Sequence, residues 1–384
     1  MTGPLELIDE LCPDGVEYKK LGDVSKIYDG THQTPKYTDN GIKFVSVENI
    51  EDLYASKKYI SVKDYEKYKI KPQINDVLMT RIGSIGICAV IEKDEPLAYY
   101  VSLALIRPDI KVVESKYLKY AIESLNGRKE LYKRTLVNAV PIKINMGDIG
   151  KIVIPVPPLE IQREIVRILD KFTELTAELT AELTAREQQY EYYRNKLFSD
   201  DDANWVTLEE ISINHDSERK PVKKGNRVSG NYPYYGASGI VDYVSEYIFD
   251  GDYLLVSEDG ANLLARTTPI AFSISGKNWV NNHAHILEFK NYDLRRYVEF
   301  YLNSIDLSSY ISSGAQPKLN QANLNKIRIP LYTDAKIHHV VDVLDRFDAI
   351  CHDLTAGLPA EIEAREQQYE YYRDKLLTFK RKEA

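Results

Sequence analysis

The sequence predicts an α+β protein built as a tandem repeat, in which each of two globular domains is followed by a long helix. Three observations support this prediction. One thirteen-residue segment occurs twice almost unchanged, heptad patterns of apolar residues accompany both copies, and short strand-like runs fill the regions between them. The length of 384 residues also exceeds what a single hydrophobic core usually serves.

The repeat is clearest in the helical segments. AREQQYEYYRNKL at 185–197 returns as AREQQYEYYRDKL at 364–376, where Asp374 replaces Asn195. Weaker matches link 151–155 with 326–330, 75–80 with 251–256, and 17–24 with 204–211. We therefore expect a pseudo-two-fold internal repeat in four segments: a first domain at 1–155, a central spacer helix at 156–200, a second domain at 201–330 and a C-terminal spacer helix at 331–384.

The two globular regions have the pattern of mixed helix and sheet. Amphipathic segments predict helices at 117–125 and 294–305, and short apolar runs bounded by Gly, Asp and Asn predict strands. The predicted strands lie at 42–47, 76–82, 86–91, 253–257 and 270–274. The sequence does not give the order of these strands in their sheets.

The first spacer has the pattern of one continuous helix. Apolar residues step alternately by four and three from Ile161 to Leu179, which is a heptad seam, and Pro158 stands where a helix can begin. Residues 159–198 would form about 60 Å of helix. One small domain cannot cover a helix of that length, so we expect it to pack on the second spacer as an antiparallel coiled coil.

The second spacer carries a similar seam from Ile337 to Leu358 that includes Leu354. Gly357 and Pro359 interrupt it, so we expect a kink or a restart with Pro359 near the first turn of the continuation. The first spacer contains the perfect four-residue repeat ELTAELTAELTA at 174–185. Each unit adds about 6 Å of rise and about 40° of rotation, which predicts a ruler that changes length by whole units.

Composition excludes several classes of protein. No apolar stretch is long enough for a membrane span, no signal peptide is evident, and three separated cysteines give neither a disulfide framework nor a zinc motif. These features predict a cytoplasmic protein. The net charge of −8 argues against nucleic acid as a partner, but residues 111–151 hold nine bases and four acids, and 218–227 hold five bases and one acid. Local surfaces therefore permit DNA binding.

No catalytic constellation is evident. The phosphate-binding loop, the dinucleotide fingerprint and the zinc-protease and serine-hydrolase motifs do not occur. Asp109, Glu114 and Lys116 loosely match a metal-dependent nuclease signature, but they stand too close in sequence to converge on Mg²⁺. His283 and His285 share one face of a strand without further ligands, so we expect a satisfied polar pair or a base-contacting pair and no metal site.

Two diverged domains, each followed by a near-identical helix containing QQYEYYR, resemble the specificity subunit of Type I restriction-modification enzymes. DGTHQTPKY at 29–37, YPYYGASGIVDYV at 232–244 and GAQPKLNQANLNKIRIP at 314–330 resemble blocks of that family's target recognition domains. The Glu-Leu-Thr-Ala units resemble its subgroup with variable tetrapeptide (TAEL-type) spacers. The resemblance covers essentially the whole chain, and it implies two globular target recognition domains separated by two long antiparallel coiled-coil helices.

The resemblance also implies a non-catalytic subunit that binds double-stranded DNA. Each recognition domain would read one half of a split target, and the halves should differ because the two domains share little identity. The helices would set the spacing and dock two modification (methyltransferase) subunits, and restriction (motor-nuclease) subunits would join them. The complex would act as a Type I site-specific deoxyribonuclease and adenine-N6 DNA methyltransferase. S-adenosylmethionine, ATP and Mg²⁺ would be used on other subunits, and this chain would bind no cofactor.

Candidate binding residues follow from side-chain chemistry and from the resemblance. Base edges need polar side chains, and phosphates need Lys or Arg. The candidate DNA-binding residues, all in turn-rich segments, are His32, Gln33, Thr34, Lys36, Tyr37, Arg81, Ser84, Lys277, Asn278, Asn282, His283, Gln316 and Lys318. The candidates for docking the modification subunits lie on the aromatic stripes of the helices and are Tyr190, Tyr193, Arg194, Tyr369, Tyr372 and Arg373.

Two other functions stay open at the level of sequence. A stand-alone nuclease built on Asp109, Glu114 and Lys116 would cut DNA with Mg²⁺ and no partner subunits. A coiled-coil scaffold with protein-only partners would keep its DNA affinity in the assembled complex when residues 111–151 are removed.

Overall fold

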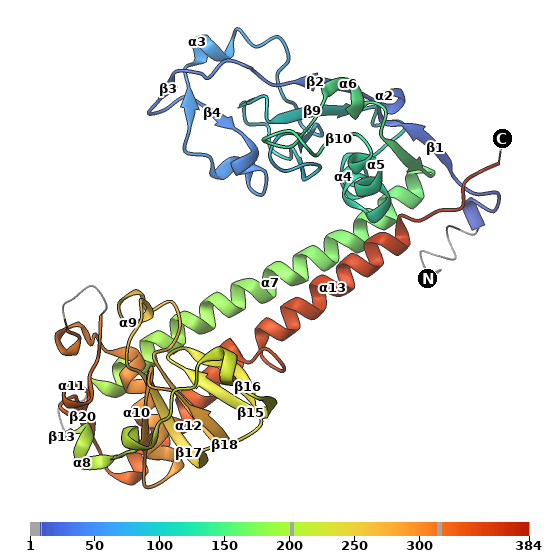
Figure 1. Cartoon of the computed structure of the whole chain (residues 1–384). Helices are drawn as coiled ribbons and strands as arrows, with labels where there is room; N and C mark the ends of the chain where they lie inside the picture. The colour runs from blue at the N-terminus through green and yellow to red at the C-terminus, as the bar shows by residue number, and fades with distance from the viewer. Residues whose placement is uncertain (1–7, 9, 200–202, 313–316, 384) are drawn as a thin grey trace. The chain divides into compact units, whose positions relative to one another are not determined.

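The computed structural model describes residues 8, 10–199, 203–312 and 317–383 (Figure 1). The chain divides into two compact units, the first formed by Met1–Glu178 with Ile362–Ala384 and the second by Leu179–Glu361. Each unit includes parts of both spacers, so the units do not coincide with the four predicted segments, whose boundaries stay a prediction. Among the described residues, no helix is both long and apolar enough to cross a membrane.

The first unit contains two four-stranded sheets. One has the order β2-β9-β6-β7, all antiparallel, and the other has the order β3-β5-β4-β8, in which β4 and β8 are parallel. Their bounds are β2 Ser25–Asp29, β3 Tyr37–Thr38, β4 Ile42–Val45, β5 Tyr59–Ile60, β6 Val77–Thr80, β7 Cys88–Val90, β8 Leu97–Tyr99 and β9 Leu103–Pro108. Helix α4 (Ser115–Glu123) packs on β7 and is followed at once by α5 (Leu125–Tyr132).

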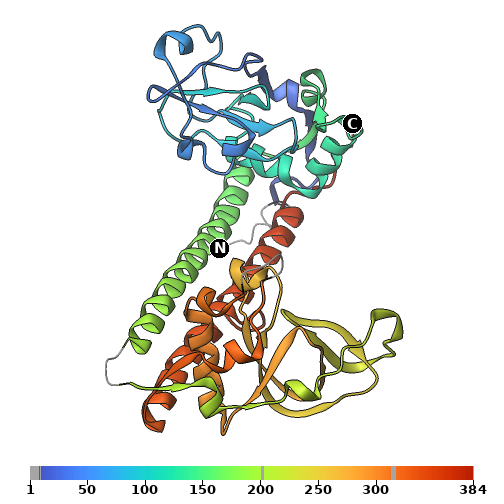
Figure 2. The ribbon, with the colours of Figure 1, turned by 60° about the vertical axis from the view of Figure 1, so that its left-hand side comes forward.

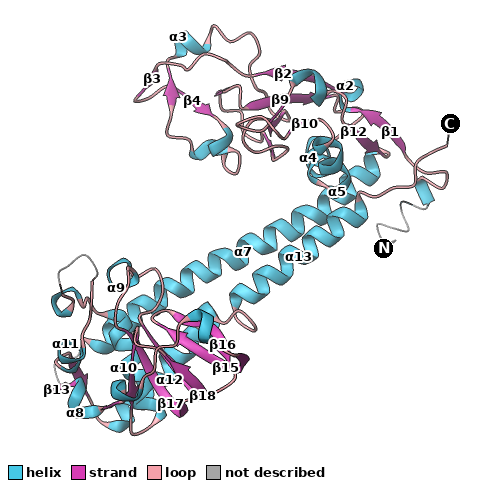
Figure 3. Ribbon diagram, viewed as in Figure 1, coloured by secondary structure: helices cyan, strands magenta, loops and turns pink. Residues whose placement is uncertain are grey.

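The second unit has one six-stranded sheet in the order β14-β19-β17-β18-β15-β16 (Figure 3). The pair β15 and β18 is parallel and the other pairs are antiparallel. The bounds are β14 Ile213–Asn214, β15 Ser229–Gly236, β16 Gly239–Val244, β17 Phe249–Ser257, β18 Ala271–Val280 and β19 Ala284–Glu288. Helix α10 (Tyr292–Ser304) packs on β17 and β18.

The two units follow one plan, as the weak sequence matches predicted. The matched segments 17–24 and 204–211 each form a strand and a one-turn helix, and 75–80 and 251–256 lie on the central strands β6 and β17. A two-stranded antiparallel ribbon precedes each long helix, β1–β12 in one unit and β13–β20 in the other. The elements concerned are β1 Glu17–Lys20, α2 Leu21–Val24, β12 Val153–Val156, β13 Asn204–Thr207, α8 Leu208–Ile211 and β20 Arg328–Leu331.

Shorter elements complete each unit. In the first unit they are η1 Val47–Asn49, η2 Leu53–Ala55, α3 Val62–Tyr65, β10 Thr135–Leu136, β11 Lys143–Ile144 and α6 Met146–Ile149. In the second unit they are η3 Asp216–Glu218, η4 Lys224–Asn226, α9 Asn262–Ala265, η5 Ser308–Tyr310 and α11 Gln321–Asn325.

The first spacer is a single helix, α7 (Leu159–Phe198), as predicted. Its first turns differ from a simple heptad seam. Ile161, Ile165 and Leu169 are buried in the core of the first unit, where the tail residues Leu377 and Phe379 also pack. The stripe of α7 that faces another helix therefore starts later in the sequence than the periodicity alone indicated.

The second spacer is two helices, α12 (Asp334–His352) and α13 (Leu358–Leu376), so the predicted restart at Gly357 and Pro359 is confirmed. A Cβ atom at Gly357 would lie 2.5 Å from the carbonyl oxygen of Ala349, which only glycine avoids. The expectation that Leu354 belongs to a buried seam is wrong, because the chain leaves the helix after His352 and Leu354 is exposed in the turn.

Equivalent aromatic pairs hold the helices together within each unit. Phe172 of α7 stacks on Tyr372 of α13 with ring centroids 5.4 Å apart, and Phe347 of α12 stacks on Tyr193 of α7 at 5.7 Å. In the first unit α7 leaves the domain while α13 returns to it alongside, and both views show this antiparallel pairing (Figures 1 and 2).

Candidate nucleic-acid interface

The predicted residues of the first domain gather at the end of β6. Arg81 follows this strand, and its Nη1 donates a hydrogen bond to the carbonyl oxygen of Val101 at 2.7 Å and lies 3.6 Å from a carboxylate oxygen of Asp29. Arg81 is buried, so its role as a base-contacting residue needs correction. Its side chain instead connects the end of β2 with the turn before β9. The exposed candidates lie in the segment that follows β2.

The segment after β2 is displayed next to Arg81. Asp29 Oδ2 lies 2.8 Å from Nε2 of the exposed His32, and Asp29 Oδ1 accepts a hydrogen bond from the Gly30 amide. Two backbone hydrogen bonds then join Thr31 to Tyr99 and Val101. The remaining candidates of this segment, all exposed, are Gln33, Thr34, Lys36 and Tyr37.

The basic region of the first domain comes to the same edge. Strand β11 is bridged to the residue after Arg81, because Ile82 pairs with Lys143 and the Ile144 amide donates to the Arg81 carbonyl at 3.0 Å. The partly exposed Ser84 lies in the same turn. The β10–β11 hairpin was missing from the predicted site, although the excess of bases in 111–151 was the signal that could have pointed to it.

The second domain repeats this arrangement at the end of β17. Asp259 pairs with Lys318 across an antiparallel bridge, as Ile82 pairs with Lys143 in the first domain. The carboxylate of Glu258 lies 2.8 Å from Lys318 Nζ and accepts from Arg219 Nη1 at 2.6 Å. Burial disfavours the ionised form of Glu258, but these two cations lower its pKa below the usual value.

Histidines complete the cluster in the second domain. His283 Nδ1 lies 2.9 Å from Asp259, and Asn282 is exposed beside it. His285 is buried, with Nδ1 2.6 Å from Asp216 and Nε2 donating to the Leu319 carbonyl at 2.7 Å. The expectation of a satisfied polar residue is thus confirmed for His285. Burial opposes ionisation of Asp216, but the bond with His285 and its charge lower the pKa of that carboxyl.

Two predicted residues lie elsewhere. Lys277 and Asn278 pair with the start of β17, at the opposite end of that strand from Glu258. Asn278 is fully buried and its amide donates to the Gly276 carbonyl, so it is a structural residue of the hairpin and its prediction as a base contact needs correction. Gln316 lies outside the described residues. Arg219 and Glu258, which the candidate set lacked, belong to the cluster.

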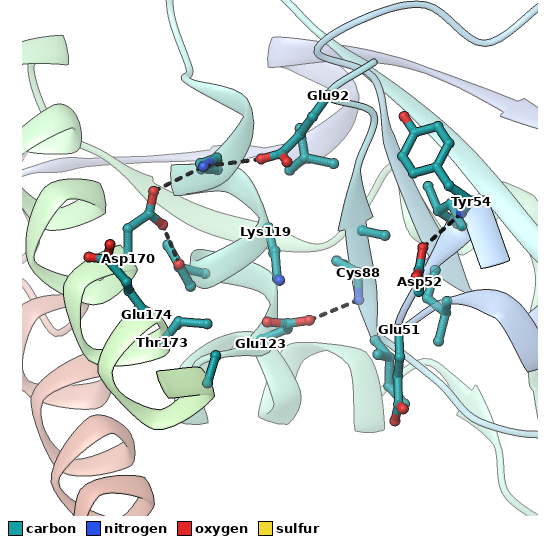
Figure 4. A pocket seen from close by; sticks show the side chains of 18 of the residues that line it. Glu51, Asp52, Tyr54, Cys88, Glu92, Lys119, Glu123, Asp170, Thr173 and Glu174 are labelled. Atoms are coloured by element: carbon teal, nitrogen blue, oxygen red, sulfur yellow. Dashed lines mark hydrogen bonds and ion pairs between the residues drawn. The ribbon is translucent and has the colours of Figure 1, made fainter. Parts of the chain in front are cut away.

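A charged pocket of about 1110 Å³ in the first unit holds none of the predicted DNA-binding residues (Figure 4). It lies between η2, β7, α4 and the first half of α7. Glu123 accepts a hydrogen bond from the Cys88 amide at 2.8 Å, and burial raises the pKa of this carboxyl. Asp170 lies close to both Lys116 and Tyr120, at 3.0 and 2.6 Å. The bonds of Asp170 tie α4 of the first domain to α7, and we assign the pocket a structural role.

The two equivalent clusters can be compared with known proteins. A family model for the Type I restriction modification DNA specificity domain matches residues 13–186 and 201–364, one match for each repeat. This chain belongs to that family. Two solved structures show the same fold at 16% identity. One is the S subunit of a Type-I restriction-modification system from M. genitalium (TM-score 0.60, 94% of this chain, 96% of that chain). The other comes from work on complex assembly and conformational transition of the type I R-M system (TM-score 0.61, 94% and 97%).

Curated relatives carry the same description. A putative type I restriction enzyme specificity subunit from Haemophilus influenzae is 36% identical over 189 residues, which are 48% of this chain and 49% of that protein. The chain thus spans about half the length of this relative. The EcoprrI specificity subunit from Escherichia coli is 30% identical over an alignment of 377 positions, which covers 90% of this chain and 91% of that protein.

The nuclease alternative for this specificity-domain protein is not supported. Glu114 caps α4 by accepting from the Tyr117 amide, Lys116 is bound to Asp170 and Glu92, and Asp109 accepts from a backbone amide two residues on. The three side chains of the proposed nuclease set therefore have separate partners. Within the described ranges, no group of three or more His, Cys, Asp or Glu side chains is arranged to hold a metal ion.

The aromatic stripes of the specificity helices have a buried and an exposed side. Tyr190 packs against Phe347, Tyr369 packs against Tyr120, and burial raises the pKa of both hydroxyls to about 12. Arg373 is also buried. The prediction that Tyr190 and Arg373 contact a modification subunit directly is therefore corrected, and both side chains pack inside this chain. Arg194 is partly buried with its guanidinium 5.3 Å from the Tyr190 ring.

Two tyrosines outside the candidate set are the most exposed of the stripes. Tyr192 and Tyr371 are each 60% exposed, and the candidates Tyr193 and Tyr372 are each 41% exposed. A lysine lies over each outer ring, Lys196 over Tyr192 at 5.8 Å and Lys375 over Tyr371 at 5.6 Å. The helical periodicity of the sequence could have identified Tyr192 and Tyr371, because residues outside the heptad seam lie on the exposed side of a paired helix.

Proposed function

We propose that this chain is the DNA-reading subunit of a type I restriction-modification complex and that each repeat reads one half of a split, asymmetric target. The observation that carries the proposal is the equivalent placement of two different polar clusters, at the end of β6 in one domain and of β17 in the other. The two clusters display different exposed side chains, Gln33 and Lys36 in the first domain against Asn282 and His283 in the second. Equivalent places with different exposed side chains suit two half-sites of different sequence.

We propose segments 1–155 and 201–330 as the two recognition domains and 156–200 and 331–384 as the spacers. DNA-contacting roles stay with the exposed candidates, which are His32, Gln33, Thr34, Lys36, Tyr37, Ser84, Asn282, His283 and Lys318. Arg219 and Glu258 are added as residues that position Lys318. Lys277 remains an exposed candidate at a separate place.

The helices would dock two copies of a modification subunit. Matched exposed sites support this, because Tyr192, Tyr193 and Lys196 recur as Tyr371, Tyr372 and Lys375 with the same exposed fractions for the tyrosines. Exposed aromatic side chains beside cations are typical anchors of protein interfaces. One of the solved neighbours comes from work on the assembly of a type I R-M system. Restriction subunits would join the assembled complex, which would work in the cytoplasm.

The finer assignments follow from the same model. The chain itself would have no catalytic role and hold no cofactor, while S-adenosylmethionine, ATP and Mg²⁺ would serve the methyltransferase and motor-nuclease subunits. The Glu-Leu-Thr-Ala units at 174–185 would make this a member of the variable-spacer (TAEL-type) subgroup, since they lie within the continuous helix α7 that both units share.

The test is a selection from random duplex DNA by the chain assembled with its modification subunits. We expect the bound DNA to share one interrupted motif whose two halves differ. Recovery of DNA with no common motif would contradict the proposal and favour the scaffold with protein-only partners. Exchange of Tyr192 and Tyr371 for Ser should lower the amount of modification subunit retained by the chain, while exchange of Ile110, exposed on the first domain, should not.

A further inference from the structure

An exposed apolar loop stands beside the interface of the first domain. It joins β10 to β11 and carries Leu136, Val137, Val140 and Ile142, which are 44%, 47%, 100% and 37% exposed. Scattered exposed apolar residues are ordinary, but several large ones within one seven-residue stretch mark a surface that contacts another molecule.

The loop is anchored at its base. The Gly83 amide donates to the Ile142 carbonyl at 2.9 Å, and the Ile144 amide donates to the Arg81 carbonyl at 3.0 Å. The loop therefore projects from the same edge that displays His32. A surface contact at this edge involves the loop and the recognition segment together.

The charged residues near the loop indicate which kind of molecule binds it. The exposed base Lys129 lies on the preceding helix α5, Lys133 directly follows that helix, and Lys143 stands at the start of β11. The acid of α5, Glu130, is already bound to Lys133 and Arg134. Bases before and after an exposed apolar loop suit DNA, where cations bind phosphates and apolar side chains contact thymine methyl groups or enter between base steps.

We propose that the loop at 136–142 enters the DNA of the first half-site, with Val137, Val140 and Ile142 against bases and Lys143 against a phosphate. This inference rests on the proposed function. The apolar side chains of the loop would contact bases, although only polar residues were candidates for base contact. The first half-site would then show a sequence preference at positions that no polar side chain contacts.

The experiment uses the complete chain assembled with its modification subunits and the duplex that the random selection identifies. We expect Val140→Ser to lower affinity for this duplex about 5- to 50-fold without changing the slope of log affinity against log salt, because no charge is removed. Lys143→Ala should reduce that slope by about one. Replacing thymines with uracil in the half-site removes the methyl groups and so tests contact with them. Insertion of the loop between bases is measured separately, by the fluorescence of 2-aminopurine placed in the half-site.

Two further variants serve as controls. Ile110→Ser removes a side chain that is 60% exposed beyond the far end of β9, and we expect parental affinity. Val137→Ser provides a second loop variant if Val140→Ser alters thermal unfolding of the chain.

Three outcomes would overturn the inference while leaving the proposed function in place. Parental affinity and parental motif in both loop variants would exclude base contact. Loss of modification subunit from the DNA-free complex of Val140→Ser would make the loop a protein contact, and a change in oligomeric state would make it a contact between copies of this chain. Failure of the unmutated complex to select any motif refutes the proposed function first, and the inference falls with it.

Discussion

At the scale of residues, buried acid–base pairs position the exposed side chains of the second domain. Asp216 is buried and accepts hydrogen bonds from His285 and from the Ile286 amide, while Glu258 joins Arg219 to Lys318. Buried charges keep this arrangement only while each has its partner, since an unpaired buried charge is strongly unfavourable. The cluster therefore fixes where Lys318 and His283 are displayed.

Removing one member of this cluster should destabilise the second domain. We expect Asp216→Ala to lower the free energy of unfolding by about 3 kcal/mol, because it leaves His285 buried without its acceptor. Both tryptophans, Trp205 and Trp279, belong to the second repeat, so tryptophan fluorescence during urea unfolding reports this domain. Asp242→Ala, which removes the partly exposed pair with Arg227 and an exposed hydrogen bond from the Tyr243 amide, should cost under about 1 kcal/mol. Equal losses in the two variants would contradict the account.

His215 should make the stability of the second domain depend on pH. Burial alone would lower its pKa, but hydrogen bonds to Glu218 and Glu288, at 2.7 and 2.8 Å, raise it above the usual value. A raised folded-state pKa gives stabilisation that is complete below the unfolded pKa and is lost as pH rises through the folded one. Compared with His215→Gln, the parent should lose up to about 1 kcal/mol of unfolding free energy above about pH 6.5. Parallel pH profiles would refute this.

The sequence predicted that His32, His283 and Lys318 are exposed, because polar side chains in Gly- and Pro-rich turns are displayed. Their contact with DNA stays a prediction. Arg81 and Asn278 have the same chemistry but are buried, and nothing local distinguishes them, because their burial depends on contacts with residues distant in sequence. The apolar loop was missed because polarity was the search criterion.

At the scale of elements, the spacer helices are held by the Phe–Tyr pairs. Phe172 and Phe347 end two similar segments, LDKF at 169–172 and LDRF at 344–347, and each stacks on a tyrosine of the other spacer. The heptad pattern predicted that the helices pair, but not the exact seam, since the first turns of α7 belong to a domain core.

Loss of one aromatic pair should loosen the second unit. We expect Phe347→Ala to lower unfolding free energy by about 1–3 kcal/mol, since it removes packing against both Tyr190 and Tyr193. Ile350→Ala on the exposed side of the same helix should change it by about 0.5 kcal/mol or less. Urea unfolding followed by tryptophan fluorescence measures both, and a larger loss in the Ile350 variant would contradict the assigned seam.

The length of α7 should set the gap in the DNA target. Deleting one Glu-Leu-Thr-Ala unit removes about 6 Å of helix, and adding one unit extends it equally, so the gap should change by about 1–2 base pairs in opposite directions. Sequencing of the DNA selected by each length variant measures the gap. A gap that stays constant in both would show that the repeat does not set the spacing.

At the scale of the whole molecule, one plan appears twice with different surfaces. Repeat matches in the sequence were enough to predict two α+β domains, each with a helix, because those matches fall on the ribbons, the central strands and the helices. Strand order and the convergence of separate turns on one edge depend on long-range pairing, for example Ile82 with Lys143, which no local pattern encodes. The two domains display different side chains at these edges, in keeping with the proposed difference between the half-sites.

The most direct test of the account is single-molecule sequencing of methylated DNA from cells with and without this gene, in the presence of its modification subunit. The account predicts adenine methylation at one interrupted, asymmetric motif that disappears with the gene. Variants of the exposed residues His32 and Lys36 should then alter one half of the motif, and variants of His283 and Lys318 should alter the other half. Identical methylation with and without the gene, or loss of both halves together in every variant, would contradict the claim that each domain reads its own half-site.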